Sequence, residues 1–121
     1  FARAFIRALT RPDEIVPSPT FTLMQHYDAA QQAIYHYDLY RVEFDADVQE
    51  LGFDDAMANG ISLIEWPERA LIPYTENRLD ILIEEVFGAS AEKRSLKIKV
   101  GAGWTERFQT LLDTFRATTN N

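Results

Sequence analysis

The spacing of apolar residues predicts a helix at the start of the chain and a loop after it. Apolar side chains recur at helical spacing through residues 1–9, and the two arginines of this segment face away from most of them. No capping residue stands before position 1, so we expect the natural helix to begin upstream of it. Pro12 and the Pro17-Ser-Pro19 run then break helical continuation and favour extended backbone.

Two pairs of β-rich segments predict two antiparallel hairpins. The first pair is Thr20–Tyr27 and Ile34–Tyr40, and the second is Arg78–Val86 and Ser95–Val100. Polar residues connect each pair, as hairpin turns require. The tripeptide His-Tyr-Asp occurs at 26–28, where it ends an arm, and at 36–38, where it lies inside one. We interpret the duplication as coincidence rather than as a repeat.

Helices and one buried strand account for the remaining patterned segments. Helical spacing and terminal glycines predict short helices at 44–52 and 53–60, and apolar spacing predicts a longer one at 104–115, before a mobile polar end. Residues 61–64 lack charge and follow a glycine, which suits a strand buried on both faces. Glu65 would stand at the carboxyl end of that strand, where open α/β sheets gather ligands. The pattern predicts a mixed sheet with helices packed on it.

Composition limits the class of protein. A chain of 121 residues has the size of one compact domain, and 46% hydrophobic with 26% charged residues is the usual balance of a globular protein. No apolar run is long enough for a bilayer, and the start lacks a secretory pattern, so we expect a cytoplasmic protein without membrane contact. The absence of cysteine removes disulfides, thiolate metal sites and cysteine nucleophiles.

The charge balance bears on possible partners. With 12 Lys+Arg against 19 Asp+Glu, the net charge of −7 opposes tight binding to a phosphate backbone. Direct capture of RNA by this chain is therefore not expected. An acidic surface suits a basic protein partner, but it is also what ordinary solubility requires.

Two carboxylates are candidates for chemistry, each with a plainer alternative. An apolar strand ending in Glu65 matches the way nucleotide hydrolases hold Mg²⁺ or its waters, although buried strands often end in glutamate. On a strand, His36, Asp38 and Tyr40 would share one face, so Asp38 could orient water beside a phosphate. The alternative for Asp38 is capping of local amides at a strand end.

The other polar candidates carry weaker patterns. Thr20 and Thr22 would share a face and could offer hydroxyls to a terminal phosphate, or they are ordinary strand formers. His26 and His36 belong to neither a G-x-S-x-G elbow nor an H-E-x-x-H helix, so we expect core or partly exposed histidines. Trp66 is either a partner or nucleotide contact, or a packing residue beside Pro67.

Four segments in one order carry a family resemblance. They are Val16-Pro-Ser-Pro-Thr-Phe-Thr-Leu, Tyr35-His-Tyr-Asp-Leu-Tyr-Arg, Glu50-Leu-Gly-Phe and Ile64-Glu-Trp-Pro-Glu-Arg. Together they closely resemble the bacterial TsaE (YjeE) family over about residues 1–86, with the remainder similar in its hairpin-plus-helix outline. The resemblance implies an α/β fold, namely a P-loop NTPase-like three-layer domain with a mixed sheet, spanning residues 1–121 as a single domain.

The resemblance also implies an activity and partners. Family members are ATPases that bind ATP and Mg²⁺ and work with the TsaB and TsaD proteins to place threonylcarbamoyl on a tRNA adenosine beside the anticodon. Contact with tRNA would then be indirect, through that complex. By matching motifs, Glu65 takes the family's magnesium position, Asp38 the position needed for hydrolysis, and Trp66 that of the tryptophan beside the acidic residue. Thr20 and Thr22 match the switch-like segment near the phosphates. The 88–94 turn aligns only loosely with the family, and it would approach the nucleotide too.

One departure from the family pattern qualifies the activity. In the family a Gly-x-x-Gly-Ala-Gly-Lys-Thr loop precedes the helix that matches residues 1–9, and these 121 residues do not contain it. We expect this chain alone to bind ATP poorly, and the loop and its strand to lie upstream in the parent protein, where their loss exposes unpaired strands. The alternative function is a non-catalytic interaction module that docks to basic partner proteins.

Overall fold

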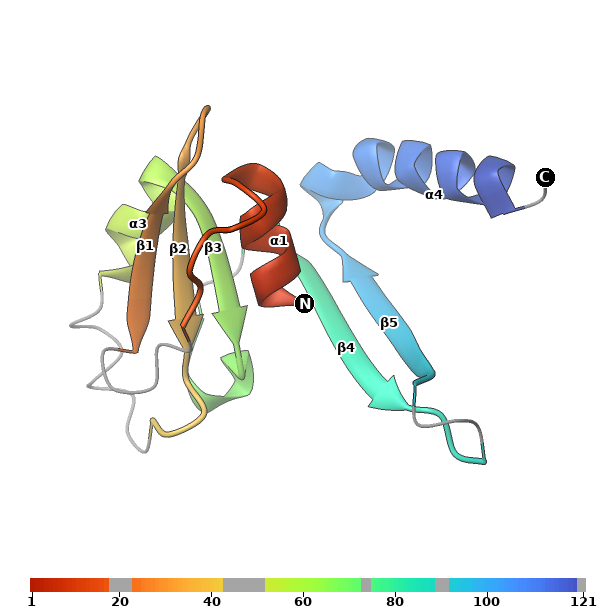
Figure 1. Ribbon diagram of the computed structural model, residues 1–121, viewed down its shortest axis with the longest axis horizontal. Helices are drawn as coiled ribbons and strands as arrows, with labels where there is room; N and C mark the ends of the chain where they lie inside the picture. Colours follow the sequence, from red (N-terminus) through yellow and green to blue (C-terminus); the bar gives the residue numbers. More distant parts are fainter. Residues whose placement is uncertain (18–22, 43–51, 73–74, 89–91, 120–121) are drawn as a thin grey trace. The chain divides into compact units, whose positions relative to one another are not determined.

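The computed structural model describes residues 1–17, 23–42, 52–72, 75–88 and 92–119 (Figure 1). The chain divides into two compact units, Phe1–Ile72 and Pro73–Asn121. Within the described ranges, no helix combines the length and apolar character that crossing a bilayer requires.

The first unit is built on a three-stranded mixed sheet in the order β1-β2-β3. Its strands are β1 (Met24–Asp28), β2 (Ala33–Asp38) and β3 (Gly60–Glu65). The first two form an antiparallel hairpin, whereas β3 runs parallel to β2 after a connection that includes helix α3 (Phe53–Asn59). The carboxyl ends of β2 and β3 therefore lie at the same edge of the sheet (Figure 1).

Alternation along the strands sends side chains to two separate cores. On one face, Ile34 of β2 packs with Tyr27, Val16 and Ile6, which belongs to helix α1 (Ala2–Leu9). On the other face, Tyr37 and Leu39 pack with Val42 and with two residues of α3, Phe53 and Ala56. Helices α1 and α3 thus cover opposite faces, and this unit has the three layers expected of the fold class.

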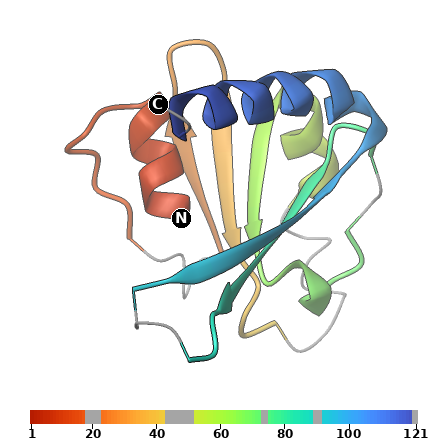
Figure 2. The same cartoon turned by 90° about the vertical axis from the view of Figure 1, so that its right-hand side faces the viewer.

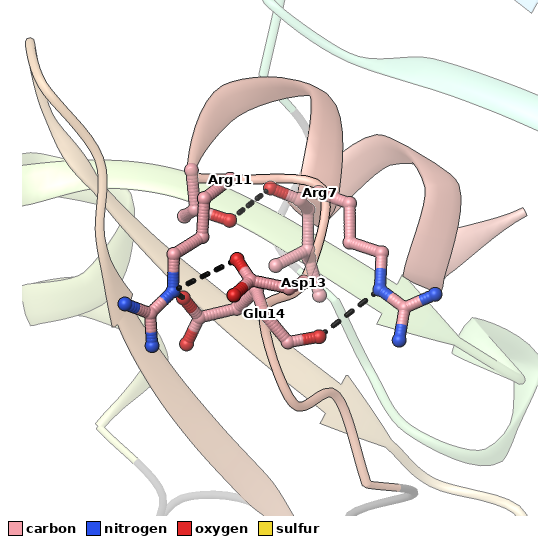
Figure 3. Close-up of polar contacts among 6 residues, drawn as sticks. Arg7, Arg11, Asp13 and Glu14 are labelled. Carbon is pink, nitrogen blue, oxygen red and sulfur yellow. Dashed lines mark hydrogen bonds and ion pairs between the residues drawn. The ribbon is translucent and has the colours of Figure 1, made fainter.

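Polar contacts fix the turn that follows α1 (Figure 3). The Arg7 Nε–H donates to the Glu14 backbone carbonyl at 3.0 Å, and Thr10 closes the helix by donating its hydroxyl to the Ile6 carbonyl at 2.7 Å. The Arg11 guanidinium lies 3.1 Å from the Glu14 carboxylate and 3.6 Å from that of Asp13. This turn leads the chain back so that Val16 joins the α1 face of the core.

The structure corrects the predicted ends of the first hairpin. The second arm was predicted to run to Tyr40, but β2 ends at Asp38 and Tyr40 lies in a turn. The prediction that the second His-Tyr-Asp copy lies inside an arm is therefore wrong, since Asp28 and Asp38 each end a strand. The physical reason is local: the Asp38 carboxylate accepts the Tyr40 amide, which bends the backbone. The described part of the first arm is Met24–Asp28, with a bend at Leu23, and the predicted start at Thr20 lies outside the described ranges.

The structure also corrects the predicted burial of β3. The strand lies where predicted and ends at Glu65, but none of its residues is buried. In the part of the chain that the structure describes, β3 is an edge strand with β2 as its neighbour, so a flank stays open. The predicted helix at 53–60 is confirmed as α3, while the one at 44–52 falls outside the described ranges.

The second unit is a hairpin followed by a helix. Strands β4 (Leu79–Glu85) and β5 (Arg94–Val100) pair antiparallel, which confirms the second predicted hairpin. A short 3-10 turn, η2 (Ala102–Trp104), leads into the helix α4 (Thr105–Thr119). Figure 2 shows α4 along its whole length. The helix continues to Thr119, so the predicted helix end near 115 is wrong, while the predicted mobility of the last residues stays a prediction. The threonine hydroxyls of α4 donate to carbonyls one turn earlier, as at Thr114 and Thr118, so these polar groups are satisfied within the helix.

Candidate functional site

Asp38 and Glu65 lie side by side at the carboxyl edge of the first sheet. They are register partners at the last position of the parallel pair β2–β3. The Leu39 amide donates to the Glu65 carbonyl at 3.0 Å, which holds the two chain ends together just beyond the strands. Because parallel partners project to the same face, the structure brings together the two carboxylates that the sequence singled out separately.

Local hydrogen bonds fix the backbone and the carboxylate of Asp38. Its amide donates to the Leu23 carbonyl at 3.1 Å, and its Oδ1 accepts the Tyr40 amide at 3.1 Å. The amide-capping alternative from the sequence is therefore confirmed. Capping does not exclude a role in catalysis, because a carboxylate oriented by its own turn is also held ready to bind a ligand.

Glu65 has a buried partner that the sequence did not predict. His36 Nε2 lies 3.0 Å from Glu65 Oε2, and the two residues come from neighbouring strands. The histidine side chain is 3% exposed, whereas that of Glu65 is 44% exposed. His36 is thus the core histidine that the sequence favoured, but it is bonded to the candidate metal carboxylate. The spacing that places His36 and Asp38 on one face of the strand was the one sequence feature that could have suggested a contact between His36 and the site carboxylates.

An aromatic pair adjoins the two carboxylates. Trp66 follows Glu65 with a left-handed backbone, φ 59° and ψ 51°, before the 3-10 turn η1 (Pro67–Arg69). Its ring centroid lies 4.9 Å from that of Tyr40, and the Arg69 guanidinium lies 5.6 Å from the Tyr40 ring. Both rings are about half exposed. The Trp66 ring therefore packs at a tilt against Tyr40 and still presents surface to a ligand or partner.

The donor set suits a hard divalent cation that other ligands help to hold. Within the described residues, no group of three or more His, Cys, Asp or Glu side chains gathers as a self-sufficient metal site. Mg²⁺ is commonly held by one or two carboxylates together with phosphate oxygens and water. Glu65 offers one partly exposed carboxylate at this edge, with Asp38 as its register partner, so the residues present would fit Mg²⁺ shared with a phosphate and water.

Four other sequence candidates lie outside this geometry. Thr20 and Thr22 fall in the 18–22 gap, so their predicted phosphate contacts stay predictions. Only the ends of the 88–94 turn are described, and the same holds for its predicted nucleotide contact. His26 is exposed beside Asp28 at the end of β1 and belongs to no cluster with the two site carboxylates.

Comparison with known proteins decides the family. Residues 1–96 match the sequence profile described as Threonylcarbamoyl adenosine biosynthesis protein TsaE. The chain belongs to the TsaE family. A TsaE protein of Rickettsia felis is 39% identical over 88 residues, covering 69% of this chain and 52% of that protein. The TsaE protein of Rickettsia conorii is 43% identical over 68 residues, covering 56% of this chain and 39% of that protein. The TsaE protein of Bacillus subtilis is 35% identical over 71 residues, covering 58% of this chain and 44% of that protein. The chain thus spans about half, or less, of these TsaE proteins.

A solved structure supports the fold assignment. The crystal structure of Bacillus subtilis YdiB superposes with a TM-score of 0.57 at 22% identity, covering 98% of this chain and 68% of that one. Together with the mixed sheet of the first unit, this likeness confirms the P-loop NTPase-like α/β class predicted for this TsaE chain. At such identity the likeness concerns the fold alone.

Proposed function

We propose that this TsaE chain carries the acidic side of a Mg²⁺-dependent ATP-hydrolysing site that serves tRNA threonylcarbamoyladenosine biosynthesis. The observation that carries the proposal is the register pairing of Asp38 with Glu65 at the carboxyl edge of β2 and β3. Ligands of open α/β sheets bind beyond such edges. Membership of the TsaE family supports the role in threonylcarbamoyladenosine biosynthesis, and the paired carboxylates support Mg²⁺-dependent ATP hydrolysis.

Each carboxylate takes a separate part in the proposed reaction. Bound Mg²⁺ would neutralise charge on the phosphates. Glu65 would hold the cation or one of its waters through a carboxylate oxygen at the strand end. Asp38, fixed by the Tyr40 amide, accepts a hydrogen bond from the attacking water and orients it toward the terminal phosphorus. The bond to ADP then breaks, and the proton of the water passes to Asp38 or to the released phosphate.

The proposal extends to partners and to cellular place. TsaB and TsaD are the proposed protein partners, and tRNA would be reached through them, because the net charge of −7 does not favour direct RNA binding. We place this activity in the cytoplasm, where tRNA is modified. Thr20 and Thr22 are proposed to donate hydroxyl hydrogen bonds to the terminal phosphate.

Steady-state ATP hydrolysis by the complete gene product that contains these residues tests the proposal. Asp38→Asn and Glu65→Gln should each lower kcat by roughly 100-fold, the usual scale for a positioned acid–base group. Asp28→Asn is the matched control, since Asp28 ends β1 in the same His-Tyr-Asp tripeptide but lies apart from the β2–β3 edge. Wild-type turnover in both site variants would show that the assignment is wrong.

A second candidate function rests on the exposed aromatic pair. Trp66 and Tyr40, with Arg69 beside them, form a half-exposed patch of the kind enriched at protein interfaces. In this alternative the chain is a non-catalytic module that docks to basic partner proteins. Calorimetry against the TsaB–TsaD complex separates the two: Trp66→Ala would abolish docking while Glu65→Gln leaves it intact, and the wild type would bind without nucleotide.

A further inference from the structure

His36 is a buried polar side chain that the proposed reaction does not use. It is 2% exposed, and its neighbours along β2, Tyr35 and Tyr37, point to the opposite face. Its Nε2 reaches Glu65 Oε2 at 3.0 Å. Burial of a polar ring at this depth is costly unless it is hydrogen-bonded, and the bond to Glu65 offsets part of that cost, which couples the carboxylate to the core.

The surroundings of the ring indicate which nitrogen carries the proton. His36 Nδ1 is buried and has no hydrogen-bond partner among the described residues. A buried donor left unpaired costs about 1–3 kcal/mol, and a carboxylate can only accept. The arrangement is best satisfied when Nε2 carries the hydrogen and donates it to Glu65, with Nδ1 left as an acceptor.

Glu65 needs such an anchor because of where it lies. Its side chain is 44% exposed at the end of an edge strand, and a glutamate there loses rotamer freedom when it is held in one orientation. The contact with His36 is made by one carboxylate oxygen, Oε2, so it leaves the second oxygen, Oε1, uninvolved. One oxygen is thus fixed by the core and the other is left for a ligand.

We propose that His36 is a positioning residue, which holds the Glu65 carboxylate ready to bind a divalent cation. The inference rests on the proposed function, because it takes Glu65 as the cation ligand. Partners that orient a ligand in this way are commonly worth 10–100-fold in metal affinity. His36 acts through Glu65 and touches neither the cation nor the nucleotide.

The chain contains its own matched control. His26 occupies the same place in the first His-Tyr-Asp copy, and its Nε2 lies 3.5 Å from the Asp28 carboxylate. That pair is exposed, with side chains 45% and 89% accessible, and it belongs to the β1 end of the sheet. A histidine–carboxylate contact of similar chemistry is thus present where no cation is proposed.

The test measures Mn²⁺ affinity in the presence of ATP by electron paramagnetic resonance, using the complete gene product. His36→Leu should weaken Mn²⁺ binding roughly tenfold. His36→Gln should restore most of it, because its amide N–H can still donate to Glu65. His26→Leu should leave the affinity unchanged, and His36→Leu should have little further effect in a Glu65→Gln background. Thermal unfolding of each variant checks that it is folded.

The outcomes separate this inference from the proposed function. If Glu65→Gln weakens Mn²⁺ binding but His36→Leu does not, or if His36→Gln is as weak as His36→Leu, the positioning role is wrong and the proposed function stands. If Glu65→Gln has no effect, the proposed function is wrong and the positioning role falls with it. Long-range ¹H–¹⁵N NMR tests the bond even where a variant fails to fold: wild-type His36 should carry its hydrogen on Nε2, and a hydrogen on Nδ1 would overturn the inference.

Discussion

Gly60 and Ala33 are register partners at the start of β3 and β2, and the Ala33 carbonyl oxygen occupies the space that a Cβ on residue 60 would need. The backbone of Gly60 is extended, so the constraint is the close approach rather than the backbone conformation. The same register ends in the Asp38–Glu65 pair. A glycine at one end of the strand pair thus helps to align the carboxylates at the other end.

We expect Gly60→Ala to destabilise the protein by about 1–3 kcal/mol, the usual cost of forcing an extra methyl group into a packed site. The added Cβ would press on a backbone carbonyl, which cannot move aside as a flexible side chain can. Urea unfolding followed by circular dichroism measures the loss. An unchanged unfolding midpoint would contradict the close approach of the two strands.

Much of this fold was predictable because its determinants are local. Apolar spacing predicted α1, and the glycines at 52 and 60 bounded α3 as expected. The uncharged run before Glu65 predicted β3 and its end. These elements depend on residues a few positions apart, and sequence patterns report such relations well.

The part that sequence did not predict depends on tertiary contacts. His36 and Glu65 are far apart in sequence, and only the parallel register of β2 with β3 brings them within 3.0 Å. The end of β2 at Asp38 follows from a side-chain hydrogen bond that strand propensity does not encode. The half-buried state of β3 depends on its place in the sheet, which periodicity alone does not give.

Two positions of α1 should respond very differently to truncation. Ile6 is fully buried against the β2 face of the core, whereas Leu9 is 41% exposed one turn later. Ile6→Ala should cost about 2–5 kcal/mol, since it removes apolar contacts and leaves a cavity. Leu9→Ala should cost less than about 1 kcal/mol, because its side chain is already partly in water. Chemical unfolding of both variants gives the comparison, and equal losses would show that Ile6 is not a core residue.

Buried tyrosines should make the protein less stable in alkali. Burial raises the pKa of the Tyr27 hydroxyl, and the nearby Glu14 carboxylate raises it further. Burial likewise raises the pKa of Tyr37, with a smaller contribution from Tyr35. The unfolded chain therefore loses these protons first as the pH passes about 10, so stability is fully present below that pH and falls as the pH rises through the folded pKa values. Unfolding free energies measured across this range, beside tyrosinate absorbance, should show that decline.

Tyr27→Phe tests the same region at neutral pH. The Tyr27 hydroxyl is buried and has no hydrogen-bond partner among the described residues. Removal of an unsatisfied buried hydroxyl should raise the unfolding free energy by roughly 1 kcal/mol, since its desolvation cost disappears while the ring stays packed. The unfolding free energy of the variant should also fall less steeply in alkali than that of the wild type, because the variant lacks the Tyr27 hydroxyl. A clear destabilisation by Tyr27→Phe would mean that the hydroxyl makes a bond in solution.

The left-handed backbone of Trp66 should reverse the usual order of alanine and glycine. A residue with a Cβ in this conformation is strained by roughly 1–2 kcal/mol, and glycine is not. Trp66→Ala and Trp66→Gly both remove the ring contact with Tyr40, so the difference between them reports the backbone alone. We expect the glycine variant to be the more stable of the two by roughly 1 kcal/mol in thermal unfolding. Leu71 provides the control, because it is exposed and its φ is not positive, and there the alanine variant should be the more stable. If the alanine variant is the more stable at both positions, the strained left-handed backbone at Trp66 is contradicted.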